Sequence, residues 1–507
     1  MNQLKKADSY IEKNKVPKDQ KPDFHVTAPV GWINDPNGFS EYRNKYHLFY
    51  QHHPYSDAWG PMHWGHCASC DFIKWEDLPE ALAPDESFDK NGCFSGSALE
   101  TDEGHALVYT GVIEKDENGK KSVFQNQCLA FGNGENYIKY DGNPVIDGNQ
   151  LPESFSREDF RDPKIWFDDG SYYLVAGNRK GDGLGQVVLF RSPDLKSWQY
   201  VTVLAENDGT YGTMWECPDF FELGDQHVLI VSPQDMRAVG NKYYNGNHVL
   251  YFLGQYNKTN CQFDYSEGVM LDFGADFYAA QTLLTNDGRR IMIAWMQSWD
   301  INIKPAEQRW NGMMTVPREL SLINGHLYQR PVRELENYLV NPIHYQNTEI
   351  SGEVSLPGIN GRVLDLSAEV LSGDFKKLSI HIAHNEEYTT CFTYNPEEQS
   401  IEFDRTYSGM RRDVVSQRKM KIDDPQSTLK LRIILDKYSA ELFVNDGYQT
   451  FSATFYTPLE ADEIVFRCDG KSVLNIEKFD KNIKINIDFY KNIWYFIRGI
   501  LKGRGRG

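Results

Sequence analysis

The sequence predicts an all-β protein with two domains. Between residues 24 and about 330, short apolar runs are separated by Gly, Asp and Asn turns, and almost no 3.6-residue periodicity is sustained. From residue 345 to 484, a second series of runs alternates apolar and polar residues every two positions. A chain of 507 residues is also too long for one ordinary domain, which favours a division into two.

An internal repeat indicates how the first domain is built. Residues 69–75 and residues 192–198 share the pattern Ser-x-Asp-(Phe/Leu)-x-x-Trp. Two copies of one motif indicate repeated sheet units, as in a β-propeller. Two copies do not define how many blades the propeller has.

The remaining segments complete the predicted domain plan. Residues 1–23 form a polar, charged extension without an apolar core segment, and residues 331–344 form a linker with a short helix or turn. Within residues 345–484, Asn-Asp-Gly at 445–447 is a hairpin signal. The end of the chain, residues 485–507, is apolar and then basic. We expect it to pack on the second domain or to be disordered, with a weak membrane-surface or partner contact as the alternative.

Composition excludes several classes of protein. The net charge of −19 argues against nucleic-acid binding, which needs a basic field. Aromatic residues make up 13% of the chain, which is typical of a cleft where flat rings pack on sugar faces. No secretory signal and no run of about 20 apolar residues is visible, so we expect a cytoplasmic protein without stable membrane insertion.

Three acidic residues stand in unusual local settings. Asp35 lies in Trp-Ile-Asn-Asp-Pro-Asn-Gly, Asp162 in Phe-Arg-Asp-Pro-Lys and Glu216 in Trp-Glu-Cys-Pro-Asp. A proline directly after Asp35 pushes this residue toward extended geometry, and the glycine at the end of its motif allows a turn. Each motif alone could be an ordinary turn. An acid on a tight turn, beside a tryptophan and two amide side chains as at Asp35, suits sugar chemistry.

These three motifs, in this order, resemble the three signatures of glycoside hydrolase family 32, which contains invertases, sucrose-6-phosphate hydrolases, inulinases and levanases. The resemblance covers roughly residues 24–484. It implies a five-bladed propeller over residues 24–330, with the acids around a central funnel, and a β-sandwich over residues 345–484. No metal and no organic cofactor is implied.

The resemblance also implies a role for each acid. Asp35 matches the nucleophile that attacks C2 of a terminal β-fructofuranosyl unit, and Glu216 matches the acid/base. Asp162 matches a residue that holds fructose hydroxyls and stabilises the transition state. Arg161, beside Asp162, is expected to favour the charged form of that carboxylate.

Further positions match residues that contact the sugar in the family. They are Asn34, Gln51, Trp59, Phe94, Ser95, Arg161, Asp276, Tyr278 and Trp310. For each of these alone, core packing or turn formation is an alternative explanation. The spacing of His and Cys in residues 63–70 could indicate zinc, but no second ligand group lies at zinc-finger distance. We interpret this stretch as a core strand.

The predicted partner is a small sugar. We expect hydrolysis of sucrose and short β-fructosides, with sucrose 6-phosphate accepted if a cation reaches the glucosyl side of the cleft. Candidate cations lie in residues 299–310 and 236–242. Fructan exo-hydrolysis or transfructosylation on the same site, an inverting arabinan-type hydrolase and a non-catalytic carbohydrate-binding protein are the alternatives. A homo-oligomer is also possible.

Overall fold

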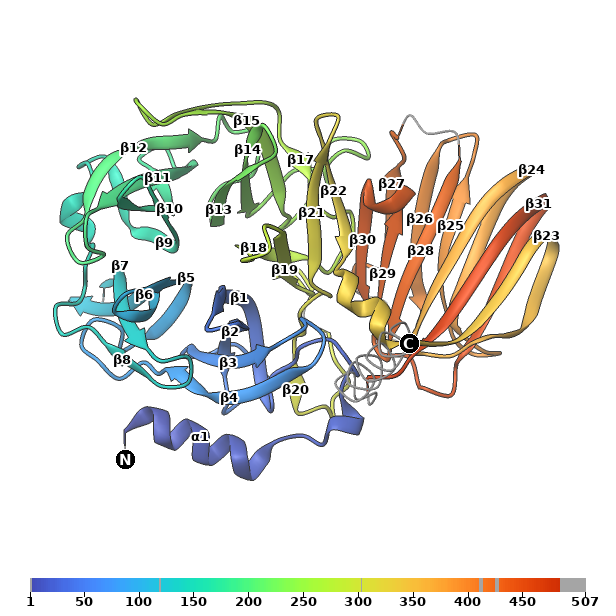
Figure 1. Cartoon of the computed structure of the whole chain (residues 1–507), viewed down its shortest axis with the longest axis horizontal. Helices are drawn as coiled ribbons and strands as arrows, with labels where there is room; N and C mark the ends of the chain where they lie inside the picture. Colours follow the sequence, from blue (N-terminus) through green and yellow to red (C-terminus); the bar gives the residue numbers. More distant parts are fainter. Residues whose placement is uncertain (1, 118–119, 302, 410–413, 425–427, 484–507) are drawn as a thin grey trace, which may run out of the picture.

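The chain folds into a ring of five sheets beside a second β domain (Figure 1). The structure is a computed structural model that describes residues 2–117, 120–301, 303–409, 414–424 and 428–483. The prediction of an all-β protein with a five-bladed propeller followed by a sandwich is confirmed. The predicted tail, residues 485–507, lies outside the described residues. No helix in the described ranges is long and apolar enough to cross a membrane.

Each blade is an antiparallel sheet whose first strand lies at the centre of the ring. Blades 1 and 2 consist of β1 (Gly31–Tyr42), β2 (Lys45–His53), β3 (His63–Ser69) and β4 (Trp75–Leu82), then β5 (Gly92–Thr101), β6 (Gly104–Glu117), β7 (Lys120–Gly132) and β8 (Tyr137–Lys139). Blade 3 consists of β9 (Phe155–Asp168), β10 (Ser171–Lys180), β11 (Gly185–Ser192) and β12 (Gln199–Glu206). Blades 4 and 5 consist of β13 (Trp215–Leu223), β14 (Gln226–Pro233), β15 (Leu250–Asn257), β16 (Gln262–Tyr265) and β17 (Val269–Met270), then β18 (Tyr278–Leu284), β19 (Arg290–Trp295), β21 (Arg318–Ile323) and β22 (His326–Pro331).

The repeated Ser-x-Asp motif forms the same turn in blades 1 and 3. In both, it connects the third strand of the blade to the fourth. The carboxylates of Asp71 and Asp194 accept hydrogen bonds from backbone N–H groups two and three residues later. The tryptophan that ends each motif donates its indole N–H to the carbonyl three residues before it. The repeat therefore reports a real structural equivalence between blades.

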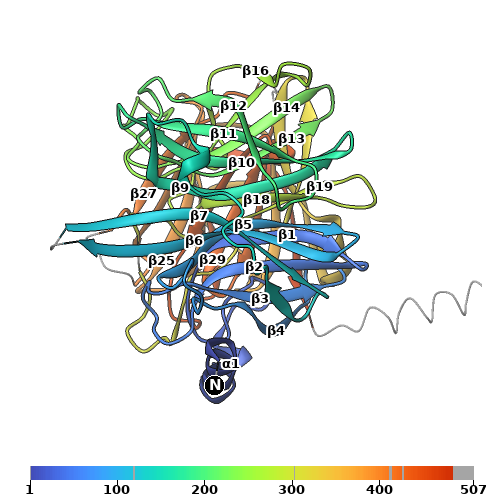
Figure 2. The same cartoon turned by 90° about the vertical axis from the view of Figure 1, so that its left-hand side faces the viewer.

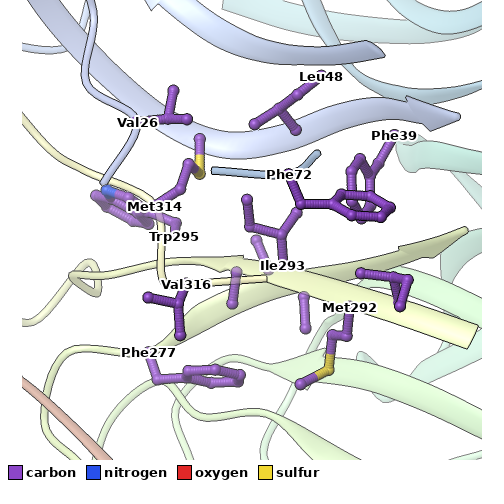
Figure 3. Packing of buried hydrophobic residues seen from close by; sticks show 14 of the residues in the cluster. Val26, Phe39, Leu48, Phe72, Phe277, Met292, Ile293, Trp295, Met314 and Val316 are labelled. Carbon is purple, nitrogen blue, oxygen red and sulfur yellow. The ribbon is translucent and has the colours of Figure 1, made fainter. Parts of the chain in front are cut away.

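The ring closes through a short strand between blade 5 and blade 1. β20 (Trp310–Asn311) arises in the connection between β19 and β21 and runs parallel to β1, pairing with Gly31 and Trp32. Buried side chains from both blades pack at this seam (Figure 3), among them Leu48 of β2 and Ile293 of β19. Burial of such side chains stabilises the closed ring by about 1.5–3 kcal/mol each.

The N-terminal extension contains a helix that the sequence did not predict. α1 (Gln3–Asn14) lies outside the ring, next to blade 1 (Figure 2), and the turn η1 (Lys18–Gln20) follows it. Asp8 accepts a hydrogen bond from the backbone N–H of Glu80, 3.0 Å away, and Tyr10 packs edge-on against Tyr55. Ala7 is buried, and Tyr10 and Ile11 pack against a buried hydrophobic cluster that includes Val30, so a short apolar face docks this helix on the propeller.

The second domain consists mainly of long strands shared between two layers. Its elements are η3 (Arg333–Tyr338), β23 (Leu339–Asn360), β24 (Leu364–His384), β25 (Thr389–Asn395), β26 (Ser400–Tyr407), β27 (Gln417–Lys421), β28 (Leu429–Asp436), β29 (Ser439–Val444), η4 (Asn445–Gly447), β30 (Gln449–Thr454) and β31 (Glu463–Lys481). The first half of β24 pairs with β28 and its second half with β25, while β31 pairs with β24 and with β23. η3 and the start of β23 fall in the stretch predicted as a linker.

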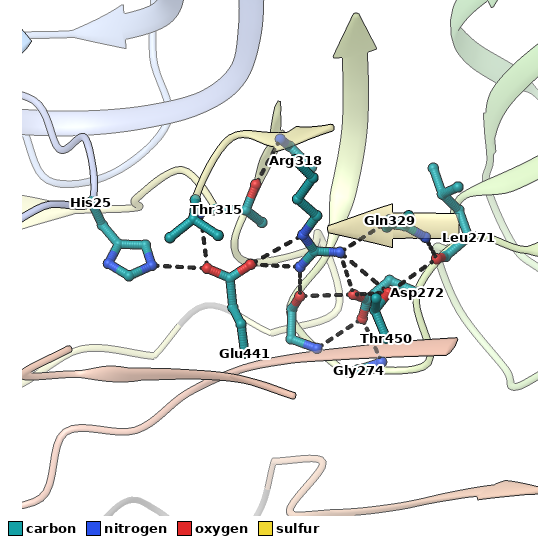
Figure 4. Close-up of polar contacts among 12 residues, drawn as sticks. His25, Leu271, Asp272, Gly274, Thr315, Arg318, Gln329, Glu441 and Thr450 are labelled. Carbon is teal, nitrogen blue, oxygen red and sulfur yellow. Dashed lines mark hydrogen bonds and ion pairs between the residues drawn. The ribbon is translucent and has the colours of Figure 1, made fainter. Parts of the chain in front are cut away.

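Buried ions join the two domains (Figure 4). The Arg318 guanidinium, on β21, donates to Asp272 Oδ2 at 3.0 Å and to Glu441 Oε2, on β29, at 2.6 Å. His25 contacts Glu441 Oε1 at 2.9 Å and Asp436 Oδ2 at 2.8 Å. All five side chains are fully buried. Carboxylates and cations therefore compensate one another across this interface.

Candidate active site

The inner strands of all five blades are irregular at one end of the funnel. β1, β5, β9, β13 and β18 each show a shift of register against the neighbouring strand there. Such bulges redirect side chains and are common beside active sites. Asp35, Asp162 and Glu216 lie at these shifts on β1, β9 and β13. The irregular backbone thus turns three acids from three blades toward the same space.

Asp35 accepts hydrogen bonds at both of its oxygens. The Asn34 amide donates to its Oδ1 at 3.0 Å, and the Ser95 hydroxyl donates to its Oδ2 at 2.7 Å. Trp32 fixes the Asn34 side chain by donating its indole N–H to the amide oxygen. Burial, and next the charge of Glu216, raise the pKa of Asp35, while the Ser95 and Asn34 hydrogen bonds oppose this shift.

Asp162 adopts a strained backbone conformation, with φ at 64°. Its own N–H donates to the Thr110 hydroxyl at 3.0 Å, and its Oδ2 accepts from the backbone N–H of Cys217 at 2.9 Å. Burial and the charge of Glu216 raise the pKa of Asp162 to about 7, although Arg161 opposes the rise. Arg161 favours the charged form of Asp162, as expected, but burial and the repulsion from Glu216 are larger, so the net pKa is raised.

Glu216 accepts a hydrogen bond at each oxygen. Arg161 Nε donates to Oε1 at 2.9 Å, and the Tyr278 hydroxyl donates to Oε2 at 2.7 Å. Arg161 also donates to Asp159 at 2.8 Å, so its direct ion pairs are with Glu216 and Asp159 rather than with its sequence neighbour. The two donors hold the Glu216 carboxylate in one orientation.

Cys217 connects the acids and was not among the predicted residues. Its Sγ lies 3.5 Å from Asp35 Oδ2 and 3.6 Å from Asp162 Oδ2. Burial, followed by the charges of Asp162 and Asp35, raises the pKa of the thiol well above its usual value. The thiol therefore stays protonated and can donate to either carboxylate. Its position next to Glu216 in the motif was the available signal.

The three acids open into one pocket of about 150 Å³. It is lined by Asn34, Asp35, Gln51, Trp59, Phe94, Ser95, Arg161, Asp162, Glu216, Gln234 and Trp299. Nine of these eleven were predicted, and the sequence analysis missed Gln234 and Trp299 as lining residues. Gln234 follows the proline that ends β14, and Trp299 lies in a segment considered above for its cations.

Aromatic rings form the rim of this pocket. Trp59 and Trp299 are 50% and 38% exposed, whereas most other lining side chains are buried. Trp59 packs edge-on against Phe94, with ring centres 6.0 Å apart, and Trp299 stacks on Trp32 at 6.2 Å. Exposed, supported rings of this kind provide faces on which a sugar can pack.

Three predicted site residues lie outside the lining of the pocket. Tyr278 is buried behind Glu216, which it contacts. Asp276 accepts a hydrogen bond from Arg405 of the second domain at 2.5 Å, so it belongs to the domain interface. Trp310 is buried on β20 beside Tyr438, where it helps to close the ring.

A larger cavity, about 700 Å³, lies against the second domain. Its walls carry ions that already pair with one another, such as Asp365 with Arg432 and Lys430 with Asp446. None of the three acids lines it, so we assign the chemistry to the smaller pocket. Across the part of the chain that the structure describes, no group of three His, Cys, Asp or Glu side chains could hold a metal ion.

Comparisons with known proteins agree with this geometry. The model of the glycosyl hydrolases family 32 N-terminal domain matches residues 25–331, and that of the family 32 C-terminal domain matches residues 334–485. Sucrose-6-phosphate hydrolase of Escherichia coli is 36% identical over 465 residues, which cover 89% of this chain and 93% of the relative. Raffinose invertase of Escherichia coli is 35% identical, with the same coverage of both chains.

Solved structures give the same result for the fold. A GH32 β-fructofuranosidase of Bombyx mori superposes with a TM-score of 0.83 at 33% identity, over 94% of this chain and 98% of its own. A mutant of the silkworm enzyme has been solved in complex with sucrose. Sucrose-6-phosphate hydrolase from Lactobacillus gasseri has a TM-score of 0.81 at 28% identity, over 94% and 96% of the two chains.

Proposed function

The chain belongs to glycoside hydrolase family 32, and from this membership we propose how its three funnel acids divide the reaction. The resemblance found in the sequence is thereby confirmed. The protein is a β-fructofuranosidase, which hydrolyses sucrose or sucrose 6-phosphate. In our proposal Asp35 is the nucleophile, Glu216 the general acid and base, and Asp162 the residue that stabilises the transition state.

The reaction then proceeds in two steps. Protonated Glu216 gives its proton to the glycosidic oxygen while Asp35 attacks C2 of the fructosyl unit, which releases glucose and leaves a fructosyl ester on Asp35. Glu216, now a carboxylate, takes a proton from water as that water attacks C2 and frees Asp35. Two displacements at C2 retain its configuration.

The contacts of Asp35 support its assignment as the nucleophile. The charge of Glu216 raises the pKa of Asp35, so a proton on Glu216 removes that repulsion and favours the ionised form of Asp35. Hydrogen bonds from Asn34 and Ser95 stabilise the same anion. Both effects favour the charged carboxylate that an attack on C2 requires.

Asp162 is suited to hold sugar hydroxyls. The backbone N–H of Cys217 fixes one of its oxygens, and the carboxylate lines the pocket beside Asp35. A carboxylate there can accept hydrogen bonds from two fructose hydroxyls and offset positive charge at the anomeric carbon.

The pocket supports sucrose and short β-fructosides as substrates in preference to long fructans. At about 150 Å³ it is smaller than the roughly 300–1,000 Å³ that enclose drug-sized ligands, so it fits one sugar ring. Arg161 is the cation among the residues that line the pocket. Its guanidinium already donates hydrogen bonds to Glu216 and Asp159. We therefore propose sucrose as the preferred substrate, with sucrose 6-phosphate as the second candidate because several relatives bear that name.

Two cations that the sequence analysis considered for a phosphate group are engaged elsewhere. Lys304 pairs with Asp57 at 2.6 Å, and Lys242 pairs with Glu267. These pairs reduce the charge available to a phosphate on the glucosyl side. A cytoplasmic site of action is also part of the proposal, supported by relatives named for a phosphorylated sugar, a dianion that membranes retain.

The convergence of Asp35, Asp162 and Glu216 around Cys217 in one pocket carries this proposal. Its test is a set of initial rates on sucrose, sucrose 6-phosphate and inulin, with methanol as a second acceptor. We expect hydrolysis of sucrose, slow action on inulin, and a methyl fructoside that retains the β configuration. A preference for the phosphorylated sugar of about 100-fold, or 2.7 kcal/mol, would reverse the substrate order.

The same assay separates the alternatives. An α-configured methyl fructoside would indicate an inverting enzyme of the arabinan-degrading type. Transfer to a second sugar that exceeds hydrolysis would indicate a transfructosylase, because the two activities differ in which molecule intercepts the fructosyl ester. Binding of sucrose without turnover would indicate a carbohydrate-binding protein.

A further inference from the structure

The two motifs that contain Asp162 and Glu216 end in residues that the mechanism does not use. These residues are Lys164 and Asp219, which lie on β9 and β13. Lys164 Nζ is 2.9 Å from Asp219 Oδ2, and the two side chains are 12% and 1% exposed. The two motifs are therefore in contact at two points, at the catalytic acids and at this buried ion pair.

The ion pair also includes blade 5. Asp219 Oδ2 accepts the backbone N–H of Thr282, on β18, at 2.6 Å, and Lys164 Nζ donates to the carbonyl of the same residue. The pair thus joins the inner strands of three adjacent blades. These same strands carry Asp162, Glu216 and its hydrogen-bond donor Tyr278.

A small polar cavity connects the ion pair with the acid cluster. It has a volume of about 10 Å³, and its lining includes Asp162 and Cys217 together with Lys164 and Asp219. The space between the two sets of groups is therefore nearly filled. A displacement of either inner strand at the ion pair would be transmitted to the acids, because close-packed interiors transmit strain.

A buried ion pair is weak evidence for stability, since apolar replacements of similar volume often serve as well. Such pairs can instead specify one arrangement of the chain. The Lys164–Asp219 pair can specify the arrangement of the funnel strands, because it contacts β9, β13 and β18. These three strands carry the transition-state stabiliser, the acid/base and the tyrosine that donates to the acid/base.

We propose that Lys164 and Asp219 are positioning residues, whose ion pair sets the relative placement of Asp162 and Glu216 by holding β9, β13 and β18 together. The inference rests on the proposed function, because it concerns the geometry of those two acids. It predicts that loss of the pair lowers the rate of the chemical step more than it weakens substrate binding.

The test compares Lys164→Met with a matched variant, Lys139→Met. Lys139 is 13% exposed and pairs at 2.6 Å with the fully buried Asp89, but it lies on β8, at the outer edge of blade 2. Both variants remove one buried lysine from an ion pair. For sucrose, we expect Lys164→Met to lower kcat about 100-fold. We expect KM to stay within about threefold of the wild-type value, and Lys139→Met to keep kcat within about twofold.

Melting temperatures from circular dichroism accompany the kinetics, so that loss of fold is distinguished from loss of rate. Equal kcat values in folded Lys164→Met and Lys139→Met would overturn the inference while leaving the proposed function intact. No turnover of any β-fructoside by the wild-type enzyme would overturn both. If Lys164→Met does not fold, Lys164→Gln and Asp219→Asn keep a polar group in place. Wild-type kcat in both would then overturn the inference.

Discussion

The funnel and the domain interface both bury carboxylates, yet with opposite electrostatic results. At the interface, Asp436 and Glu441 face His25 and Arg318. Although burial opposes the shift, His25 lowers the pKa of Asp436, and Arg318 with His25 lowers that of Glu441. In the funnel, by contrast, the pKa values of two acids are raised.

The difference follows from the ratio of acids to cations. Arg161 is the cation among the residues that line the pocket of the three acids, and it pairs with Glu216 and Asp159 while its charge also acts on Asp162. Burial and mutual repulsion therefore raise the pKa values of Asp35 and Asp162. Two cations for three acids stabilise the fold at the interface, whereas the three acids of the funnel have one cation in the pocket lining, which is a cost to stability that function requires.

The largest expected effect is on activity in the funnel. Asp35→Asn and Glu216→Gln should each lower kcat for sucrose by about 10⁴-fold or more, because each removes a group that takes part in bond making or proton transfer. The free energy of unfolding should be unchanged or higher in Asp35→Asn, since this variant removes a repelling charge, whereas Glu216→Gln should gain less because it also removes an anion that pairs with Arg161. Steady-state kinetics and urea unfolding measure both quantities. Near-normal activity in Asp35→Asn would exclude it as the nucleophile.

At the domain interface, a substitution should lower stability and leave activity nearly unchanged. Glu441→Gln leaves Arg318 and His25 without their shared anion, which should lower the free energy of unfolding by about 3–5 kcal/mol. The kcat of the folded enzyme should stay within about twofold of wild type, because the network does not line the pocket.

Glu477→Gln is the matched control for this change. Glu477 pairs with His344 at 3.0 Å on the surface of the second domain, where both side chains are about half exposed. Exposed pairs contribute about 0–1 kcal/mol, so this variant should unfold almost as wild type does. A large loss of kcat in Glu441→Gln without a loss of stability would contradict the division of roles between the two regions.

A smaller effect sharpens the comparison through Asp162. Its pKa is about 7 in the folded protein and about 3.9 in the unfolded chain, so between these values the folded state holds the extra proton. Stability contributed by this group therefore falls as pH rises from about 4 to 7. Asp162→Asn removes the carboxylate and with it this loss of stability, so the variant should melt about 1–3 °C above wild type at pH 8. The two melting temperatures should become equal near pH 4.

Thermal melts of both proteins across this pH range measure the effect, together with a severe loss of activity in the variant. A variant that melts below wild type at pH 8 would show that hydrogen bonds to the carboxylate outweigh its repulsion. The funnel would then resemble the interface, and the contrast between the two regions would not hold.

Sequence reasoning succeeded where short contiguous motifs carry the structure. The three acids and six further lining residues were identified because their motifs are local and the inner strands repeat around the ring. The partners of these residues were harder to predict. Arg161 lies beside Asp162 in sequence but pairs with Glu216, 55 residues away, because successive side chains of a strand point to opposite faces and the register of β9 shifts at this point.

Contacts between segments that lie far apart in the sequence explain the other differences. Asp276 and Trp310 match family positions near the cleft, yet the side chains contact the second domain. α1 carries too few apolar residues to be predicted, and its contacts with blade 1 become visible only in the folded chain. The ion pair of Lys164 and Asp219 likewise depends on the angle between blades, which no local pattern encodes.

The smallest expected effect concerns His25 at the interface. The pKa of His25 is raised, because Asp436 and Glu441 more than offset its burial. Its contribution to stability is therefore fully present below the unfolded value of about 6.5 and is lost as pH rises through the folded value. The melting temperature of His25→Gln should therefore lie furthest below that of wild type between about pH 5 and 6.5. This gap in melting temperature should narrow by about 1–2 °C toward pH 9. A constant gap across this range would mean that the pKa of His25 is the same in the folded and unfolded states, so that Arg318 is the cation that compensates the interface carboxylates above about pH 6.5. The interface would then have one cation, Arg318, for its three acids, as the funnel has Arg161 for its three, and the ratio of acids to cations would no longer distinguish the two regions.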